Sequence, residues 1–357
     1  MRIKSWMVRS PAEPMVLEER DESPHAGEVL VEVAGCGVCR TDLEFYYEGI
    51  PTRRPFPLTL GHEISGRVVE AGEGAEPWIG RHVIVPAVIP CGVCEACRAE
   101  RGPVCPHQVF PGCDVHGGFA THLCVPARGL CPVPDLSDPT QNPLGLDLAS
   151  LAVVADAIAT PYQAILRSGL EPGDLAVFVG AGGLGGFGVQ IAAERGAVVV
   201  AVDVDPRRLD RLPSHGAALV LRADELDFRE LRRRVRELAR HQAIPTWRHR
   251  IFETSGTPEG QATAFGLVGH GGYLAVVGYT PAKVQVRLSN LMALDAAACG
   301  NWGCLPEHYP AALGLALSGK VAIAPFVERR PLDAINETFE ELRIGRIAKR
   351  VILVPDG

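Results

Sequence analysis

Four cysteines lie within fifteen residues of this chain, and their spacing is C-x2-C-x2-C-x7-C: Cys91, Cys94, Cys97 and Cys105. One loop with this spacing can wrap four thiolates around a tetrahedral zinc ion and leave no coordination position open. Iron–sulfur clusters and disulfides also use closely spaced cysteines. We favour a closed, structural zinc site, which braces a loop but activates no substrate.

The start of the chain, MRIKSWMVRSPAEP, lacks the apolar segment and small-residue cleavage site of a signal peptide. It therefore predicts a cytoplasmic protein. In that reducing compartment the eleven cysteines are expected to be metal ligands or free thiols rather than disulfides.

A second group of metal-binding residue types lies upstream. The stretch CGVCRTD runs from Cys36 to Asp42, and about twenty residues later GHEISGRV supplies His62 and Glu63. A thiolate and an imidazole with carboxylates nearby are the ligands of a catalytic zinc that keeps one position open for a substrate oxygen. Spacing alone leaves a second interpretation, a buried cysteine and an unrelated core histidine.

A glycine-rich turn indicates dinucleotide binding. Gly180, Gly182 and Gly185 form G-x-G-x-x-G in GAGGLG, with Gly183 and Leu184 between them, after an apolar strand and before a helix. Such glycines let the pyrophosphate approach the backbone at a helix N-terminus.

The residues after the next expected strand bear on cofactor choice. Asp203 ends that strand, where a carboxylate accepts hydrogen bonds from both ribose hydroxyls and repels a 2′-phosphate. This favours NAD. Arg207 and Arg208 follow closely, and either could pair with the 2′-phosphate of NADP; Arg208 is the one that we include in the cofactor site.

The composition and the hydrophobic pattern along the 357 residues predict an α/β protein with two domains. Residues 1–153 are rich in Gly, Pro and Cys and carry short β-type runs, whereas residues 154–296 alternate strands and helices, which predicts a doubly wound parallel sheet. We expect residues 297–357 to return to the first domain.

Composition argues against several function classes. The net charge of −7 disfavours a nucleic-acid partner, and the basic stretch at 229–238 has interleaved glutamates typical of a solvated helix face. No apolar run approaches the ~20 residues of a membrane helix, so we expect no membrane partner.

CGVCRTD, GHEISGRV, the four-cysteine lobe and GAGGLG occur in the order found in zinc-dependent medium-chain alcohol dehydrogenases. The resemblance spans essentially the whole chain. It implies a GroES-like β-rich catalytic domain, a Rossmann domain that binds NAD, and two zinc ions per chain, one catalytic and one structural.

The same resemblance assigns ligands to the catalytic zinc. It implies that Cys39 and His62 bind the metal, that Glu63 binds it directly or lies just behind its ligands, and that Asp156 is the third protein ligand. A capping role for Asp156 is the alternative. Cys36 is expected to be a small buried core residue rather than a fifth ligand.

The resemblance also implies a reaction, hydride transfer between a secondary alcohol and NAD. Thr41 is the expected first proton relay and Arg40 the expected pyrophosphate contact. Many members of the family carry a histidine where this chain has Glu44, so Glu44 or water is expected to end the relay.

Within the family, longer stretches such as PLTLGHEISG and NWGCLPEHYPAALGLALSGKVAIAPFVERRPL are most similar to 6-hydroxycyclohex-1-ene-1-carbonyl-CoA dehydrogenases of anaerobic aromatic compound degradation. Arg40 departs from the histidine expected in that group. The resemblance implies a small-molecule substrate, an acyl-CoA, whose phosphates Arg53 and Arg54 would contact. We also expect a homo-oligomer, a dimer or a tetramer.

Three other functions remain open at this point. A general alcohol or polyol dehydrogenase would use the same zinc and cofactor residues. A zinc-free quinone reductase would share GAGGLG but would not need Cys39, His62 and the cysteine lobe. A non-catalytic zinc-binding interaction protein would need the lobe but no dinucleotide fingerprint.

Overall fold

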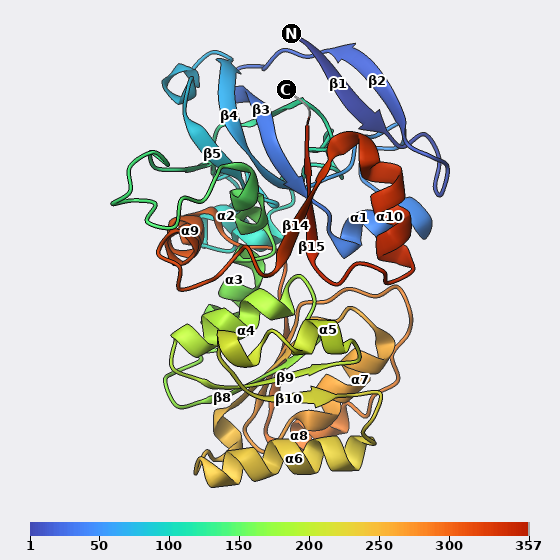
Figure 1. The fold of residues 1–357 in the computed structure, drawn as a ribbon, viewed down its shortest axis with the longest axis vertical. Coiled ribbons are helices and arrows are strands. Elements are labelled where there is room, and N and C mark those ends of the chain that lie inside the picture. Colours follow the sequence, from blue (N-terminus) through green and yellow to red (C-terminus); the bar gives the residue numbers. More distant parts are fainter. Residues whose placement is uncertain (356–357) are drawn as a thin grey trace. The chain divides into compact units, whose positions relative to one another are not determined.

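The computed structural model describes residues 1–355 and divides the chain into two units (Figure 1). Unit 1 contains Met1–Ala159, Gly303–Gly319 and the chain from Val327 onward, and unit 2 contains Thr160–Trp302 and Lys320–Phe326. The boundaries expected after residues 153 and 296 are therefore six residues early. The physical reason at the second boundary is that residues 297–300 form a strand of the unit 2 sheet.

Unit 1 is built on a seven-stranded sheet in the order β14-β15-β3-β4-β5-β7, with β6 paired to β3 and a separate β1-β2 ribbon. Every pairing is antiparallel except that of β14 with β15. Its strands are β1 (Arg2–Met7), β2 (Val16–Asp21), β3 (Glu28–Gly37), β4 (Glu63–Ala71), β5 (His82–Val85), β6 (His122–Pro126), β7 (Cys131–Pro132), β14 (Val327–Pro331) and β15 (Arg350–Val354). Its helices are α1 (Arg40–Tyr47), α2 (Glu95–Arg98), α9 (Tyr309–Leu317) and α10 (Ile335–Arg343).

Apolar side chains of β3, β4 and β15 form the core of unit 1 together with Phe119 and Phe339, which pack edge to face at a centroid distance of 5.7 Å. Because the last strand of the chain pairs with β3, the C-terminal segment is part of this core. β15 thereby delivers its first residue, Arg350, to the centre of the unit, where it is buried.

Unit 2 is a six-stranded, fully parallel sheet in the order β10-β9-β8-β11-β12-β13. In chain order this is 3-2-1-4-5-6, the doubly wound arrangement whose strand order reverses between β8 and β11. Its strands are β8 (Leu175–Val179), β9 (Val198–Asp203), β10 (Ala217–Arg222), β11 (His249–Glu253), β12 (Tyr273–Val276) and β13 (Ala297–Gly300). Its helices are α4 (Gly185–Glu194), α5 (Pro206–Leu209), α6 (Phe228–His241), α7 (Pro258–Leu267) and α8 (Ser289–Leu294). The expected fold class is confirmed.

The apolar stretch before unit 2 is not one continuous α-helix. A 3-10 segment, Ala149–Ala155, ends at Asp156, whose backbone angles of φ −141° and ψ −56° are not helical, and α3 (Ala159–Arg167) begins after it. By length and composition the whole stretch 149–167 would suit a membrane span, but 83% of its most apolar window is buried inside the protein, as in a core helix.

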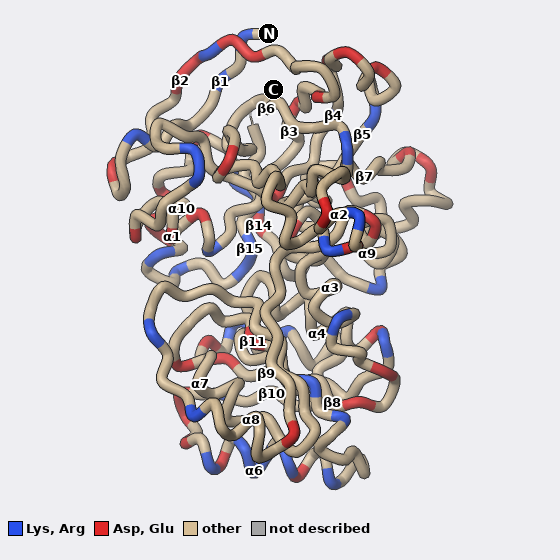
Figure 2. Tube along the Cα trace, turned by 180° about the vertical axis from the view of Figure 1, so that it is seen from behind, with Lys and Arg blue, Asp and Glu red and all other residues tan. Residues whose placement is uncertain are grey.

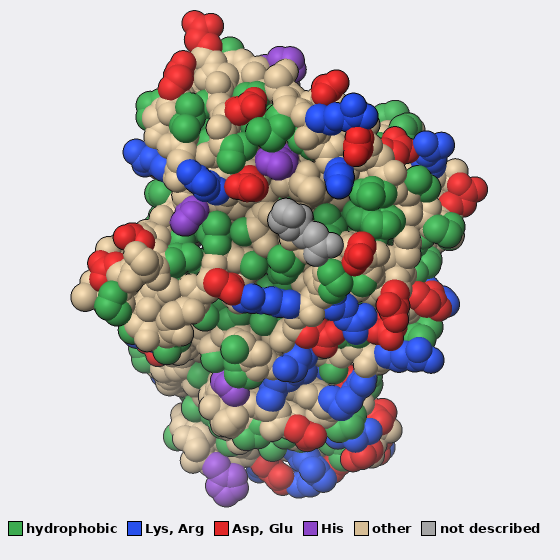
Figure 3. All heavy atoms as spheres, turned by 45° about the horizontal axis from the view of Figure 1, so that its top comes forward, with side chains coloured by type: hydrophobic (Ala, Val, Ile, Leu, Met, Phe, Trp, Pro, Cys, Tyr) green, Lys and Arg blue, Asp and Glu red, His purple; other side chains and the backbone are tan. Residues whose placement is uncertain are grey.

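Charged side chains of both signs are interleaved on the surface. Along α6, Arg233 pairs with Glu230 and Glu237, and Arg234 pairs with Glu230, so the basic stretch is a solvated helix face as expected (Figure 2). The face drawn in Figure 3 likewise mixes basic and acidic side chains.

Candidate metal centres and cofactor site

The four clustered cysteines converge in a small lobe of unit 1. The Sγ atoms of Cys94 and Cys97 are 3.5 Å apart, those of Cys94 and Cys105 are 3.6 Å apart, and those of Cys91 and Cys97 are 3.9 Å apart. Zinc–sulfur bonds of about 2.3 Å in a tetrahedron place neighbouring sulfurs about 3.8 Å apart. The lobe therefore fits one zinc ion.

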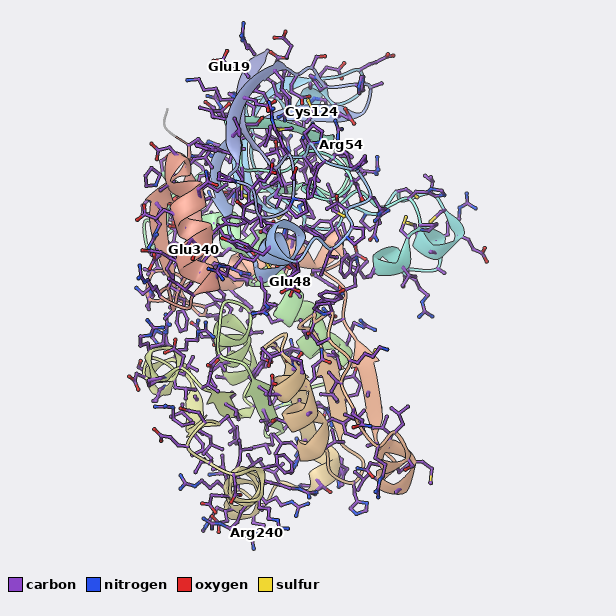
Figure 4. The ribbon with its side chains drawn as sticks, turned by 90° about the vertical axis from the view of Figure 1, so that its right-hand side faces the viewer. Glu19, Glu48, Arg54, Cys124, Arg240 and Glu340 are labelled. Atoms are coloured by element: carbon purple, nitrogen blue, oxygen red, sulfur yellow. The ribbon has the colours of Figure 1, made fainter. Side chains whose placement is uncertain are left out.

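The other interpretations of the lobe fit less well. All eleven cysteines are free thiols, and sulfurs in mutual contact leave no room for a multi-iron core. The backbone N–H of Val93 lowers the pKa of Cys91 to about 6, whereas burial raises the pKa of Cys97 to about 12, so the sulfur distances and not the pKa values support the metal site. Figure 4 shows the lobe, with α2, standing out from the rest of unit 1.

A second cluster lies at the centre of unit 1. Cys39, His62, Glu63 and Asp156 are all buried and each offers a ligand atom, and these four atoms lie within 4.8 Å of one another. The Oδ2 atom of Asp156 is 3.7 Å from Cys39 Sγ and 3.9 Å from His62 Nε2. The structure thus brings together all four residues that the sequence nominated.

Three different local structures aim these side chains at one point. Cys39 is the N-cap of α1 just after β3, His62 precedes β4, and Asp156 occupies the break between two helical segments. In an unbroken helix, the helical backbone would set the direction of the Asp156 side chain. Asp156 is the C-cap residue of the 3-10 segment and lies three residues before the start of α3, so it is not the N-cap of that helix.

Asp42, in the first turn of α1, holds two of the ligands in place. Its Oδ2 accepts the backbone N–H of Cys39 at 2.9 Å, and its Oδ1 accepts that of Gly61 at 3.1 Å and lies 3.3 Å from His62 Nδ1. An imidazole whose Nδ1 faces a carboxylate is oriented to offer Nε2 to a metal.

Glu63 is paired with Arg350 from the C-terminal strand, whose Nη2 donates to Glu63 Oε1 at 2.6 Å. The other oxygen, Oε2, is buried with no hydrogen-bond partner among the described residues. Burial raises the pKa of Glu63 to about 8, although the Arg350 guanidinium opposes this rise. The carboxylate occupies space that only glycine leaves open, since a Cβ on Gly37 would lie 2.0 Å from Oε2.

The charges of this cluster match a divalent cation. With a divalent cation bound, a thiolate at Cys39 and carboxylates at Glu63 and Asp156 would carry −3 and Arg350 +1, and the remaining −2 would balance the cation. An uncompensated buried charge costs several kcal/mol. One S donor, one N donor and carboxylate oxygens are ligands that zinc accepts, and the unpartnered Oε2 of Glu63 agrees with a missing cation.

The three predicted reaction residues of α1 lie on its first two turns. The Thr41 hydroxyl is 3.9 Å from Cys39 Sγ, and Glu44 is one turn further on. Arg40 donates from Nε to Glu44 Oε1 at 3.3 Å. Burial raises the pKa of Glu44 to about 7, even though Arg40 opposes the shift, so this carboxyl titrates where a general base is effective.

In unit 2 the glycine fingerprint joins β8 to α4, which begins at Gly185. A Cβ on Gly180 would lie 2.5 Å from the backbone nitrogen of Ser255, and one on Gly185 would lie 1.8 Å from the Gly180 carbonyl oxygen. Both glycines are therefore required by close backbone approach. Gly182, Gly183 and Leu184 occupy the turn between them, before the helix N-terminus.

Asp203 is fixed beside this turn at the end of β9. Its Oδ2 accepts the backbone N–H of Ala181 at 2.6 Å. Arg207 pairs with Asp205 at 2.7 Å, whereas Arg208 reaches to 3.7 Å from Asp203. Of the two arginines, Arg208 is thus the one beside the cofactor turn.

Two residues of the metal centre were missed in the sequence. Asp42 was visible as the last letter of CGVCRTD, but nothing marked it as a partner of His62. Arg350 opens the apolar strand RVILV, 287 residues after Glu63, and an arginine at the head of a core strand was the only available signal.

Comparison with known proteins identifies a family for each part of the chain. Residues 25–135 match the alcohol dehydrogenase GroES-like domain, and residues 183–318 match the zinc-binding dehydrogenase domain. The chain is 31% identical to an alcohol dehydrogenase of Geobacillus stearothermophilus, with 92% of this chain and 91% of that protein covered. It is 30% identical to L-threonine 3-dehydrogenase of Pyrococcus abyssi, with 98% and 97% covered.

A solved structure of similar fold is the alcohol dehydrogenase of Aeropyrum pernix, with a TM-score of 0.85 at 28% identity over 99% of this chain and 100% of that one. The two domain matches, the full-length relatives and the two thiol-containing metal clusters agree. The chain therefore belongs to the zinc-dependent medium-chain alcohol dehydrogenase family and is an NAD-linked oxidoreductase.

Proposed function

We propose that this protein oxidises a secondary alcohol, or reduces the corresponding ketone, with Cys39, His62 and Asp156 as the ligands of the catalytic zinc. The observation that carries the proposal is the convergence of buried S, N and O donors within 4.8 Å. Bound zinc supplies a Lewis acid that lowers the pKa of a substrate hydroxyl. Glu63 forms an ion pair with Arg350 beside these ligands.

Proton movement is assigned to α1. Thr41 lies beside the Cys39 ligand, so its hydroxyl can accept the alcohol proton and pass it on. Glu44 is three residues further along the same helix, and positions i and i+3 share a helix face. We assign Glu44 as the proton acceptor that ends the relay, with Arg40 stabilising its carboxylate.

Pyrophosphate and ribose binding is assigned to unit 2. The turn of Gly180, Gly182 and Gly185 presents backbone N–H groups at the start of α4, and Asp203 suits the ribose hydroxyls of NAD. Arg40 remains a predicted pyrophosphate contact, and Arg208 a predicted contact at the adenosine end.

For the substrate we propose 6-hydroxycyclohex-1-ene-1-carbonyl-CoA, on the strength of the extended sequence resemblance. Of the two arginines that would contact its phosphates, Arg53 is already paired with Asp114 at 2.7 Å, which leaves Arg54 as the better candidate. A general secondary-alcohol dehydrogenase is the alternative, since the metal and cofactor residues do not contact the parts of a substrate that distinguish one alcohol from another.

We further propose a cytoplasmic homo-oligomer that pairs through β13. This strand is the last in the parallel sheet, and three of its four residues are exposed. Leu288 and Met292 of the neighbouring α8 segment are 70% and 78% exposed. An unpaired apolar sheet edge is a template for a second strand, and a second copy offers the same edge across a two-fold axis.

The two metal clusters are expected to differ in function. Cys39→Ser should retain the fold, lose one zinc and reduce turnover to below about 1%, because it removes a ligand of the open site. Cys97→Ser should instead lower the thermal midpoint by roughly 5 °C or more with the catalytic zinc retained. Metal analysis, thermal melts and NADH formation check this, and full activity in a Cys39→Ser protein that lacks one zinc would refute the assignment.

Glu44→Gln is expected to change the pH profile. The base form of Glu44 exists above its pKa of about 7, so kcat/KM of the unaltered enzyme should fall as pH decreases through that value. The amide cannot accept a proton, so the variant should be roughly 10²-fold slower above pH 7 and lack that limb. Glu73→Gln, at an exposed glutamate of unit 1 that is not among the charges shifting the pKa of Glu44, is the control. An unchanged profile in Glu44→Gln would assign the limb to another group.

Substrate choice is tested by kcat/KM for 6-hydroxycyclohex-1-ene-1-carbonyl-CoA, its free acid and simple cyclohexanols. We expect the thioester to be preferred by roughly 10²-fold or more, because binding energy from the CoA moiety helps to orient the reacting carbon. Equal efficiency with all three would support the general dehydrogenase.

Ala298→Pro tests the β13 interface. Ala297 and Asn301 direct their backbone N–H groups toward β12, so that of Ala298 points to the free edge. Proline there should convert the oligomer into smaller species in light scattering while circular dichroism stays unchanged, because edge strands tolerate proline. An unchanged mass would exclude this edge as the interface.

A further inference from the structure

Two basic side chains meet at Thr59, a buried residue three positions before His62. Arg20, from β2, donates from Nη1 to the Thr59 hydroxyl at 3.3 Å. His116 accepts the backbone N–H of Thr59 on its Nδ1 at 3.2 Å. The hydroxyl and the backbone of one residue therefore bring a guanidinium and an imidazole together.

The backbone bond fixes the state of His116. An Nδ1 atom that accepts a hydrogen bond carries no proton, so the proton of the neutral ring is on Nε2. Burial and the nearby Arg20 and Arg54 guanidinium groups lower the pKa of His116 to about 3, which keeps the ring neutral at ordinary pH. The ring thus offers one N–H donor, Nε2, to a ligand.

The positive charge at this cluster is incompletely balanced. Arg20 is paired with Glu22 at 2.6 Å, but its Nη2 is buried and has no hydrogen-bond partner among the described residues. Arg54, labelled in Figure 4, is exposed, and within residues 1–355 its guanidinium forms no ion pair. Its backbone N–H donates to the carbonyl of Cys113 at 2.9 Å, which keeps it beside the 110–116 loop that carries His116.

We propose that Arg20, Arg54 and His116 form a binding site for a phosphate group. Three separate donors and one unpaired cation suit a tetrahedral anion with several oxygens better than a single planar carboxylate. Acidic groups in the surrounding loops are already used, because Asp114 pairs with Arg53 and Glu22 with Arg20. Arg20 therefore has Glu22 as a partner, whereas the Arg54 guanidinium has no carboxylate partner among the described residues.

The phosphate site lies near the proposed catalytic zinc site, so one substrate molecule could contact both. Three residues span at most about 10 Å, so Thr59 holds the phosphate site close to the zinc ligand His62. A substrate that carries a phosphate at some distance from its alcohol could occupy both. Identifying that phosphate with the CoA moiety rests on the proposed function, whereas phosphate binding itself does not.

Two variants isolate the ligand contacts from the fold. Arg54→Gln removes the unpaired cation at the surface. His116→Asn keeps an amide oxygen near the position of Nδ1, which can still accept the Thr59 N–H, but loses the Nε2 donor. Arg67→Gln, an exposed arginine of β4 with the same charge change, is the control. Thermal melts should show all three folded.

The measurement is calorimetric binding to the zinc-loaded protein of inorganic phosphate, CoA and 3′-dephospho-CoA, without turnover. We expect Arg54→Gln and His116→Asn each to weaken phosphate and CoA binding by roughly tenfold or more, and Arg67→Gln to bind as the unaltered protein does. Weaker binding of 3′-dephospho-CoA than of CoA would identify the 3′-phosphate of the substrate handle as the occupant, and equal binding of both would identify its pyrophosphate. Binding of inorganic phosphate without binding of either CoA compound would identify free phosphate.

Unchanged phosphate binding in both variants, or an equal loss in Arg67→Gln, would overturn the site. Oxidation of a simple secondary alcohol by the same variants separates this result from the proposed function. Normal turnover with lost phosphate binding supports the site. Lost turnover in the unaltered protein would count against the dehydrogenase assignment and leave the phosphate measurement standing.

Discussion

Charge balance at one buried point constrains the rest of unit 1. Cys39, Glu63 and Asp156 bring three groups that can become anionic into contact with one guanidinium, Arg350, and a bound divalent ion would balance their two remaining negative charges. Without that compensation, each buried charge would cost several kcal/mol. The β3–α1 junction, the start of β4, the helix break at Asp156 and strand β15 all meet at this cluster, which couples the C-terminal strand to the metal site.

The different roles of the two metal clusters follow from the positions of their ligands in the sequence. The lobe uses four sulfurs from one short loop, so its metal is enclosed and the loop can form locally. The central cluster takes its ligands from positions more than a hundred residues apart, and it can form only when unit 1 is folded. The lobe has little apolar content, and its metal stabilises it. In the central cluster the order is reversed, because the folded core of unit 1 holds the sulfur, nitrogen and oxygen donors together.

Unit 2 shows the same dependence of a short motif on distant packing. Gly180 is needed for the turn and also because the Ser255 backbone passes 2.5 Å from where a side chain would begin. Asp203, expected to hold ribose, also accepts a backbone hydrogen bond from Ala181 and so shapes the turn that would receive the pyrophosphate. A substitution at either position would therefore disturb the backbone as well as the cofactor contacts.

The sequence by itself determined the features that depend on local spacing: the cysteine lobe, the glycine turn between a strand and a helix, and the sheet class of unit 2. The nomination of Cys39, His62, Glu63 and Asp156 came from the resemblance of the sequence to a family. It did not reveal β10 or β13, because both are edge strands whose side chains are largely exposed or only partly buried. Since β13 was missed, the second domain boundary was set too early. Only the tertiary structure showed Asp42 behind His62, Arg350 on Glu63, and the gathering of Arg20 and His116 at Thr59. These contacts join residues far apart in the chain, and no local periodicity records which distant side chains the folding of a sheet will place together.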